Sequence, residues 1–264
     1  MFVTKRSGER EEFDEDKVRR AILRVGVTDV VAEDILQNVK RDLHDGITTE
    51  EIYRKVHHLL EKKKMVKFGL KEAILDLGPE GYNFESFIGK MFQALGYSVT
   101  LREKIQGKCV SHEIDVMVEK GSERYMIECK FHNSPGMKCS IQTALYTYAR
   151  FLDVNESLPH TTPWLVTNTK FTTDVIRYAG CCGMKLLGWR FPEEEGLERL
   201  IDSNRLFPLT SLGLKRSHER ILLARNFVLL SDVVKNDECL YELLPEKDAE
   251  RALTRAKEIL GRGL

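Results

Sequence analysis

Residues 112–130 constrain the fold of this chain more than any other stretch, because they have the pattern of two strands joined by a turn. Branched apolar residues occupy every second position over residues 114–118, and apolar residues do so again over residues 125–131. An alternation with a period of two is typical of half-buried strands, and the Gly-Ser pair at residues 121–122 suits a tight turn. The sequence therefore predicts a β-hairpin here.

The polar side chains of this hairpin are those that metal-assisted hydrolysis requires. Side chains two residues apart on a strand project from the same face, so Glu128 and Lys130 are expected to lie together. Asp115 stands among apolar residues on the preceding strand, where an unpaired carboxylate is costly. Two carboxylates and an amine can hold a hard divalent cation beside a reactive water. We predict that Asp115, Glu128 and Lys130 form one catalytic site.

Composition and charge are those of an ordinary soluble protein. Of 264 residues, 42% are hydrophobic and 31% are charged, which is sufficient for a buried core. The 41 basic residues balance 41 acidic ones, so there is no overall positive field to attract nucleic acid. No apolar run is long enough to span a membrane and no signal peptide is evident, so we expect a cytoplasmic protein without a membrane partner. The six cysteines show no CxxC spacing, which argues against a zinc site.

The predicted elements divide the chain into three parts. Residues 1–78 begin with a short hairpin and continue as four helices, the last two over residues 48–60 and 66–77. Residues 80–205 follow the order α-β-β-β-α-β-α-β, which indicates an α/β (α+β) core with a mixed sheet. Residues 206–264 form a helical tail. It faintly resembles a degenerate helix-hairpin-helix, but the glycine pattern of that motif is largely missing, which favours a helical cap.

The first part, residues 1–78, resembles an ATP-cone, the small regulatory nucleotide-binding domain of ribonucleotide reductases and of their repressor. The resemblance rests on residues 3–8, 11–14, 17–22 and 48–52. It implies that an adenine nucleotide, ATP or dATP, binds as an effector, and the chain has no P-loop pattern that would make ATP a fuel. Matched position by position, the residues that hold the phosphates and the nucleotide are Lys5, Arg6, Glu11, Lys17 and Thr49, and those that line the base are Val3, Phe13 and Val18.

The second part, residues 80–205, resembles the Mrr-like restriction endonuclease branch of the PD-(D/E)xK nuclease superfamily. The matching stretches are residues 84–87, 113–116, 128–130 and 166–168, with a glutamine in the helix between the last two. The resemblance implies a restriction-endonuclease-like αβββαβ core and a metal-dependent endodeoxyribonuclease. The implied roles are as follows: Asp115, Glu128 and the backbone carbonyl of Cys129 bind Mg²⁺ or Mn²⁺, Lys130 orients or deprotonates the attacking water, and Glu85 and Gln142 are auxiliary.

These interpretations combine into one hypothesis, a nucleotide-regulated DNA endonuclease that acts in restriction and defence or in DNA repair. The expected partners are DNA, an adenine nucleotide and a second copy of the chain, in a homodimer or a higher homo-oligomer. The alternative is a nucleotide-sensing DNA-binding regulator whose nuclease fold no longer cuts. Five basic residues are candidates for phosphate contacts, although each is more often a solvated surface charge: Arg102, Lys104, Lys108, Lys138 and Lys170.

Overall fold

The structure is a computed structural model that describes residues 2–5, 9–23, 29–134 and 136–261, with the backbone alone at residues 29–30 and 61–69. The chain forms two compact units, Met1–Gly69 and Leu70–Leu264. Within the described ranges, no helix is both long and apolar enough to cross a membrane.

The first unit is a small hairpin followed by helices. Strand β1 (Phe2–Thr4) pairs antiparallel with β2 (Arg10–Glu12), as the sequence predicts. Helices α1 (Glu15–Leu23) and α2 (Asp29–Arg41) follow, and then α3 (Thr49–Leu75) begins. Their apolar side chains share one core, formed by Val3, Ile22, Ala32, Ile35, Leu36, Val39, Ile47, Ile52 and Leu60.

Helix α3 begins as predicted but does not end where expected. Its capping box is present, because the Glu51 N–H donates to Thr48 Oγ1 at 3.1 Å and the Thr48 N–H donates to the Glu51 carboxylate at 2.9 Å. The prediction of separate helices over 48–60 and 66–77 is wrong, because α3 is continuous. Residues 61–65, Glu-Lys-Lys-Lys-Met, are all good helix formers and include no glycine or proline. In the described part of residues 1–78 there are therefore three helices and not four.

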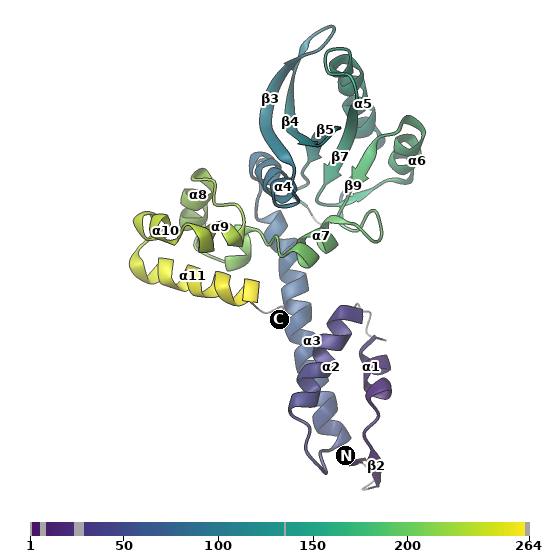
Figure 1. Ribbon diagram of the computed structural model, residues 1–264, viewed down its shortest axis with the longest axis vertical. Helices are drawn as coiled ribbons and strands as arrows, with labels where there is room; N and C mark the ends of the chain where they lie inside the picture. The colour runs from purple at the N-terminus through teal and green to yellow at the C-terminus, as the bar shows by residue number, and fades with distance from the viewer. Residues whose placement is uncertain (1, 6–8, 24–28, 135, 262–264) are drawn as a thin grey trace. The chain divides into compact units, whose positions relative to one another are not determined.

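The second unit is built around a five-stranded sheet (Figure 1). After α4 (Tyr82–Ala94), the strands β3 (Ser98–Gln106), β4 (Ser111–Lys120) and β5 (Glu123–Lys130) form an antiparallel meander. Strands β7 (Thr161–Thr167) and β9 (Lys185–Leu187) extend the sheet in parallel from β5. Helices α5 (Ile141–Asn155) and α6 (Thr173–Cys182) connect the parallel strands, and β6 (Lys138–Cys139) pairs with β8 (Lys170–Phe171) beside them. The predicted element order and the α/β fold class are confirmed.

The predicted hairpin is formed by β4 and β5. Their register runs from Val116 opposite Ile127 to Lys120 opposite Glu123, and Gly121 turns with a φ of 61°. Because glycine adopts a positive φ at little energetic cost, Gly121 allows the chain to turn between β4 and β5 at this position.

Helices cover both faces of the sheet, as Figure 1 shows. Phe84, Phe87 and Met91 of α4 pack with Val116 and other apolar residues of the central strands. On the opposite face, Ala144 of α5 and Val175 of α6 share a cluster with residues of β7 and β9. Alternate residues of each strand therefore serve two different cores, as expected of a layered α/β domain.

The helical tail packs into the same core as α4. After α7 (Leu197–Asn204), the tail consists of a 3₁₀ helix (Leu209–Leu212), α8 (Arg216–Ala224), α9 (Leu230–Lys235), α10 (Asp237–Leu243) and α11 (Glu246–Gly261). Ala249, Ala252 and Ala256 form a buried face of α11, and such small residues allow close approach to α9. Thr210 Oγ1 also donates to the carbonyl of Ala73 at 2.5 Å, at the end of α3. The tail is thus an integral layer of the second unit.

Candidate active site

Asp115 and Glu128 come together because of where the ladder between β4 and β5 ends. The register of these strands ends at the pair Val116–Ile127, and Asp115 is the residue that directly precedes Val116. Beyond that pair, the N–H of Cys129 donates to Asp115 Oδ2 at 2.7 Å, so a carboxylate takes the place of a ladder carbonyl. This bond fixes Asp115 against the strand that carries Glu128.

The segment after Lys130 is held by the predicted motif at the end of β7. Thr167 Oγ1 donates to the carbonyl of Lys130 at 2.7 Å. Asn168 forms two bonds with the backbone of His132, accepting from its N–H and donating to its carbonyl, both at 2.9 Å. Thr167 and Asn168 therefore position the backbone of β5 where its catalytic candidates end, and both are buried.

Glu85, in the first turn of α4, joins the two hairpin carboxylates. Its Oε2 lies 3.2 Å from Nη1 of Arg102 on β3. Burial raises the pKa of Glu85, and the charge of Asp115 raises it further. Arg102 itself has a φ of 51°, a conformation that is uncommon for a residue with a side chain. Strain of this kind concentrates at functional sites, and here it occurs at the arginine that contacts Glu85.

The three carboxylates destabilise one another's charge. Burial raises the pKa of Asp115. Burial also raises the pKa of Glu128 to about 7, with a further contribution from the charge of Asp115. A half-buried cluster of carboxylates that repel each other is the electrostatic setting in which a divalent cation is stabilising.

The donor set fits a magnesium-type ion. Among the described residues, no three His, Cys, Asp or Glu side chains form a group that could hold a metal by themselves. Mg²⁺ is usually bound through one or two carboxylates, with waters completing about six oxygen ligands. Burial raises the pKa of the Cys129 thiol well above its usual range. The donor of this residue that a hard, oxygen-preferring ion would use is its backbone carbonyl.

The raised pKa of Glu128 predicts how the metal-free protein responds to pH. The folded state binds more protons than the unfolded state between the ordinary value of 4.5 and about 7. The free energy of unfolding should therefore fall as pH rises through this window and level off above it. Urea denaturation with EDTA at pH 5, 6, 7 and 8 measures this slope. Glu128→Gln should flatten it, and an equal slope in that variant would contradict the assignment.

Arg150 is a site residue that the sequence analysis missed. It extends from α5, is only 9% exposed, and its guanidinium contacts both the carboxylate of Glu128 and the carbonyl of Glu113. An arginine in a helix is usually solvated, so no local signal marked Arg150 as buried.

Lys130 and Gln142, the other two predicted site residues, are both exposed. Lys130 is exposed and projects from the same strand face as Glu128, two residues along β5. Gln142 is exposed in the first turn of α5. The charges of Asp115 and Glu85 act on Glu128, whereas Lys130 and Gln142 occupy solvent-facing positions.

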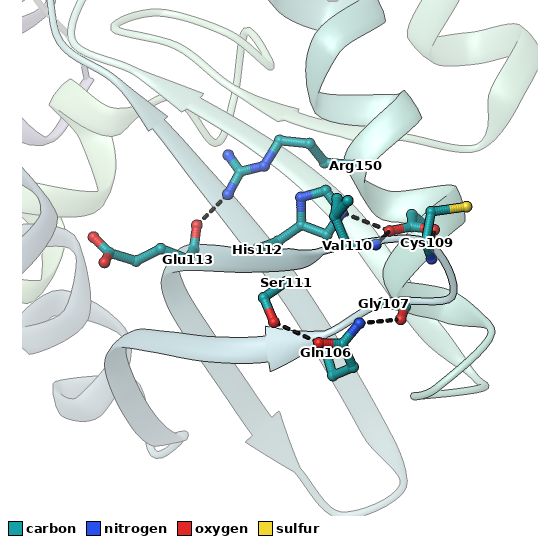
Figure 2. A network of polar contacts seen from close by, with 9 residues as sticks. Gln106, Gly107, Cys109, Val110, Ser111, His112, Glu113 and Arg150 are labelled. Atoms are coloured by element: carbon teal, nitrogen blue, oxygen red, sulfur yellow. Dashed lines mark hydrogen bonds and ion pairs between the residues drawn. The ribbon is translucent and has the colours of Figure 1, made fainter.

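A polar network holds the loop between β3 and β4 against α5 (Figure 2). Asp153 accepts the N–H groups of Cys109 at 2.7 Å and Val110 at 3.2 Å, and it lies 2.8 Å from Nε2 of His112. The bond to His112, followed by these backbone donors, lowers the pKa of Asp153. An open groove of about 540 Å³ runs between this loop and α5 and reaches Arg150. His112 therefore helps to shape the edge of the site.

In the first unit, three of the predicted nucleotide-binding residues form one cluster. Lys5 Nζ lies 3.0 Å from one carboxylate oxygen of Glu11, and Lys17 Nζ lies 3.2 Å from the other. The bond to Lys5, and then that to Lys17, lowers the pKa of Glu11. Thr49 opens α3, next to Thr48, which bridges to β1 at Thr4.

The remaining cone candidates are placed as follows. Val3 is buried in the core of the first unit, and Phe13 and Val18 pack against that core. Arg6 lies outside the described residues. Among the described cone candidates, Lys5 and Lys17 carry the positive charge that a phosphate would bind.

Comparisons with known proteins support this division. Residues 1–69 match the ATP cone domain, and residues 78–188 match the restriction endonuclease family. An uncharacterized protein from Archaeoglobus fulgidus is 43% identical over 176 residues, which cover 66% of this chain and all of that protein. A crystal structure of a protein of unknown function superimposes with a TM-score of 0.63 at 40% identity, covering 69% of this chain and 100% of the other.

A repair endonuclease from Pyrococcus abyssi is much more distant, with a TM-score of 0.33 at 13% identity over 41% of this chain and 46% of that one. The resemblances that the sequence motifs indicate are confirmed by the two family matches. The chain therefore belongs to the restriction endonuclease family through residues 78–188, and it carries an ATP cone domain at residues 1–69.

Proposed function

We propose that this protein is a divalent-metal-dependent DNA endonuclease whose activity responds to an adenine nucleotide. The observation that carries the proposal is the convergence of Glu85, Asp115 and Glu128 at the end of the β4–β5 hairpin, with burial raising the pKa of each. Membership of the restriction endonuclease family supports a nuclease-type reaction at this position.

The residues that would hold Mg²⁺ or Mn²⁺ are Asp115, Glu128 and the carbonyl of Cys129. When bound there, the ion supplies Lewis-acid stabilisation of charge on the phosphate oxygens. Asp115 keeps a fixed direction because the Cys129 N–H holds one of its oxygens. Glu85 completes the negative field from α4.

Lys130 is the residue proposed to act on the attacking water. Its ammonium projects from the same strand face as Glu128, and it is open to solvent and so to a substrate. It can orient or deprotonate the water, and it can offset charge that develops on the phosphate in the transition state. Gln142, exposed at the start of α5, is an auxiliary contact in the same proposal.

The nucleotide is proposed to act through the Lys5–Glu11–Lys17 cluster. Triphosphate oxygens would compete with Glu11 for the two ammonium groups, which are within reach of one another because they share that carboxylate. Thr49 at the N-terminus of α3 adds a helix end, which favours anions. ATP or dATP regulates cleavage only if it binds the active and inactive states with different affinity.

Supercoiled plasmid tests the enzyme proposal directly. The purified protein should nick or linearise it with Mg²⁺ or Mn²⁺, and the rate should change when ATP or dATP is added. EDTA should abolish cleavage, because it removes the cation that stabilises the negative charge on the phosphate. A gel-shift assay on the same DNA runs in parallel. Retained binding with no cleavage under any combination would reject the enzyme and favour a non-cleaving regulator.

A further inference from the structure

Arg150 contacts the candidate metal ligand Glu128 from the side of α5. Its Nη1 donates to Oε2 of Glu128, and its Nη2 donates to the backbone carbonyl of Glu113, as Figure 2 shows for the second contact. Both side chains of the ion pair are largely shielded, with exposures of 10% for Arg150 and 16% for Glu128. Such an arginine is not a solvated surface charge.

The two contacts join the strands that carry the candidate metal ligands. Glu128 belongs to β5, whereas Glu113 belongs to β4, two residues before Asp115. The planar fork of a guanidinium presents several N–H groups in fixed directions, so one arginine can hold a carboxylate and a carbonyl at once. Arg150 thereby fixes one oxygen of Glu128 relative to the backbone that positions Asp115.

The guanidinium is itself held in place. The Cζ atom of Arg150 lies 5.3 Å from the ring centroid of Tyr146, one turn earlier in α5. A cation near an aromatic face is attracted to it, so Tyr146 helps to hold the guanidinium in place. Nearby, Asp153 ties the loop before Glu113 to the same helix. The arrangement is fixed from both sides.

We propose that Arg150 is a positioning residue that holds one carboxylate oxygen of Glu128 and leaves the other directed at the divalent cation. The inference rests on the proposed function, since it assigns Glu128 to the metal. Partners of this kind fix ligand orientation, and their loss typically weakens metal binding or activity by about 10- to 100-fold. A lysine can supply the charge of Arg150 but not its fork, so it cannot hold Glu128 and the Glu113 carbonyl together.

The test is the affinity of the full-length protein for Mn²⁺, measured by calorimetry without DNA. Arg150→Lys and Arg150→Met should both bind Mn²⁺ about 10- to 100-fold more weakly than wild type. Arg190→Met is the control for loss of an arginine–carboxylate pair, because Arg190, whose side chain is 65% exposed, pairs at 2.6 Å with Glu198 outside this site. Its affinity for Mn²⁺ should be unchanged. Arg150→Lys keeps the charge at the buried pair, which protects folding, and circular dichroism verifies this.

Each alternative outcome has a distinct meaning. Wild-type affinity in Arg150→Lys would show that charge alone suffices and would overturn the positioning role. Tighter binding in Arg150→Met would overturn it also, since Arg150 would then be a competitor of the cation. Mn²⁺ binding by wild type without plasmid cleavage would reject the nuclease while leaving the comparison of Arg150 variants valid. A wild-type protein that binds no Mn²⁺ would reject both proposals.

Discussion

Replacing Asp115 by asparagine is expected to lower plasmid cleavage by about 10²- to 10³-fold, the loss typical when a group that stabilises transition-state charge is removed. The amide retains an oxygen that can accept the Cys129 N–H, which the carboxylate accepts at 2.7 Å, so the strand end should keep its shape. What the variant loses is the negative charge for the cation. Initial rates of plasmid nicking, with Mn²⁺ affinity measured on the same samples, give the size of both effects.

Asp202→Asn is the control, because Asp202 is an exposed aspartate of α7 in the same unit. It should cleave like wild type. Lys130→Met is a useful companion, since Lys130 is proposed to act on water and should lose cleavage while retaining Mn²⁺ binding. Asp115→Asn with undiminished cleavage would contradict the site, whatever its metal affinity.

Replacing both Lys5 and Lys17 by methionine is expected to weaken ATP binding by about 100-fold or more, because hydrogen bonds to charged groups contribute about 1.5–3 kcal/mol each. Both ammonium groups share Glu11 in the structure and are the proposed contacts of the triphosphate. Calorimetric titration with ATP and with dATP measures the loss. Methionine keeps much of the length of the side chain, so the change is one of charge.

Lys40→Met is the control, because it removes a different ion pair of the ATP cone domain. Lys40 lies 2.7 Å from Glu15 and is comparably exposed, but it is outside the Lys5–Glu11–Lys17 cluster. ATP affinity should survive this substitution, and Asp115→Asn should leave it unaltered as well. If the double variant binds ATP like wild type, the cluster is not the nucleotide site and the cone's ligand must be held elsewhere.

The sequence predicted best where a regular period combined with a turn signal. The β4–β5 hairpin has both, and its polar positions then placed Asp115 and Glu128 near each other. The predicted break between two helices near residues 61–65 is wrong, because lysine and glutamate favour helix and no glycine or proline interrupts these residues. Charged side chains need exposure to solvent, and the surface of a helix provides it as well as a loop does.

Two features of the site depend on tertiary structure and so had no local signal. Arg150 is buried because the loop held by Asp153 and the end of β5 meet at its position, and neither is near it in the sequence. Arg102 has a positive φ without being a glycine or asparagine, which no propensity indicates. The position of Glu85, by contrast, could be predicted from the local sequence, because the apolar period of α4 places it in the first turn of that helix.

The helical tail has a consequence for how the second unit holds together. Phe87 of α4, Leu240 of α10 and Ala252 of α11 belong to one continuous hydrophobic cluster, and Thr210 is bonded to Ala73. A fragment limited to residues 78–188 would therefore leave a broad apolar face uncovered, although that span is what the family match covers. We therefore expect the smallest fragment that folds by itself to be longer than residues 78–188. The sheet and the tail should unfold together in a single cooperative thermal transition. The tail is therefore a structural part of the second unit, and its removal should destabilise the sheet.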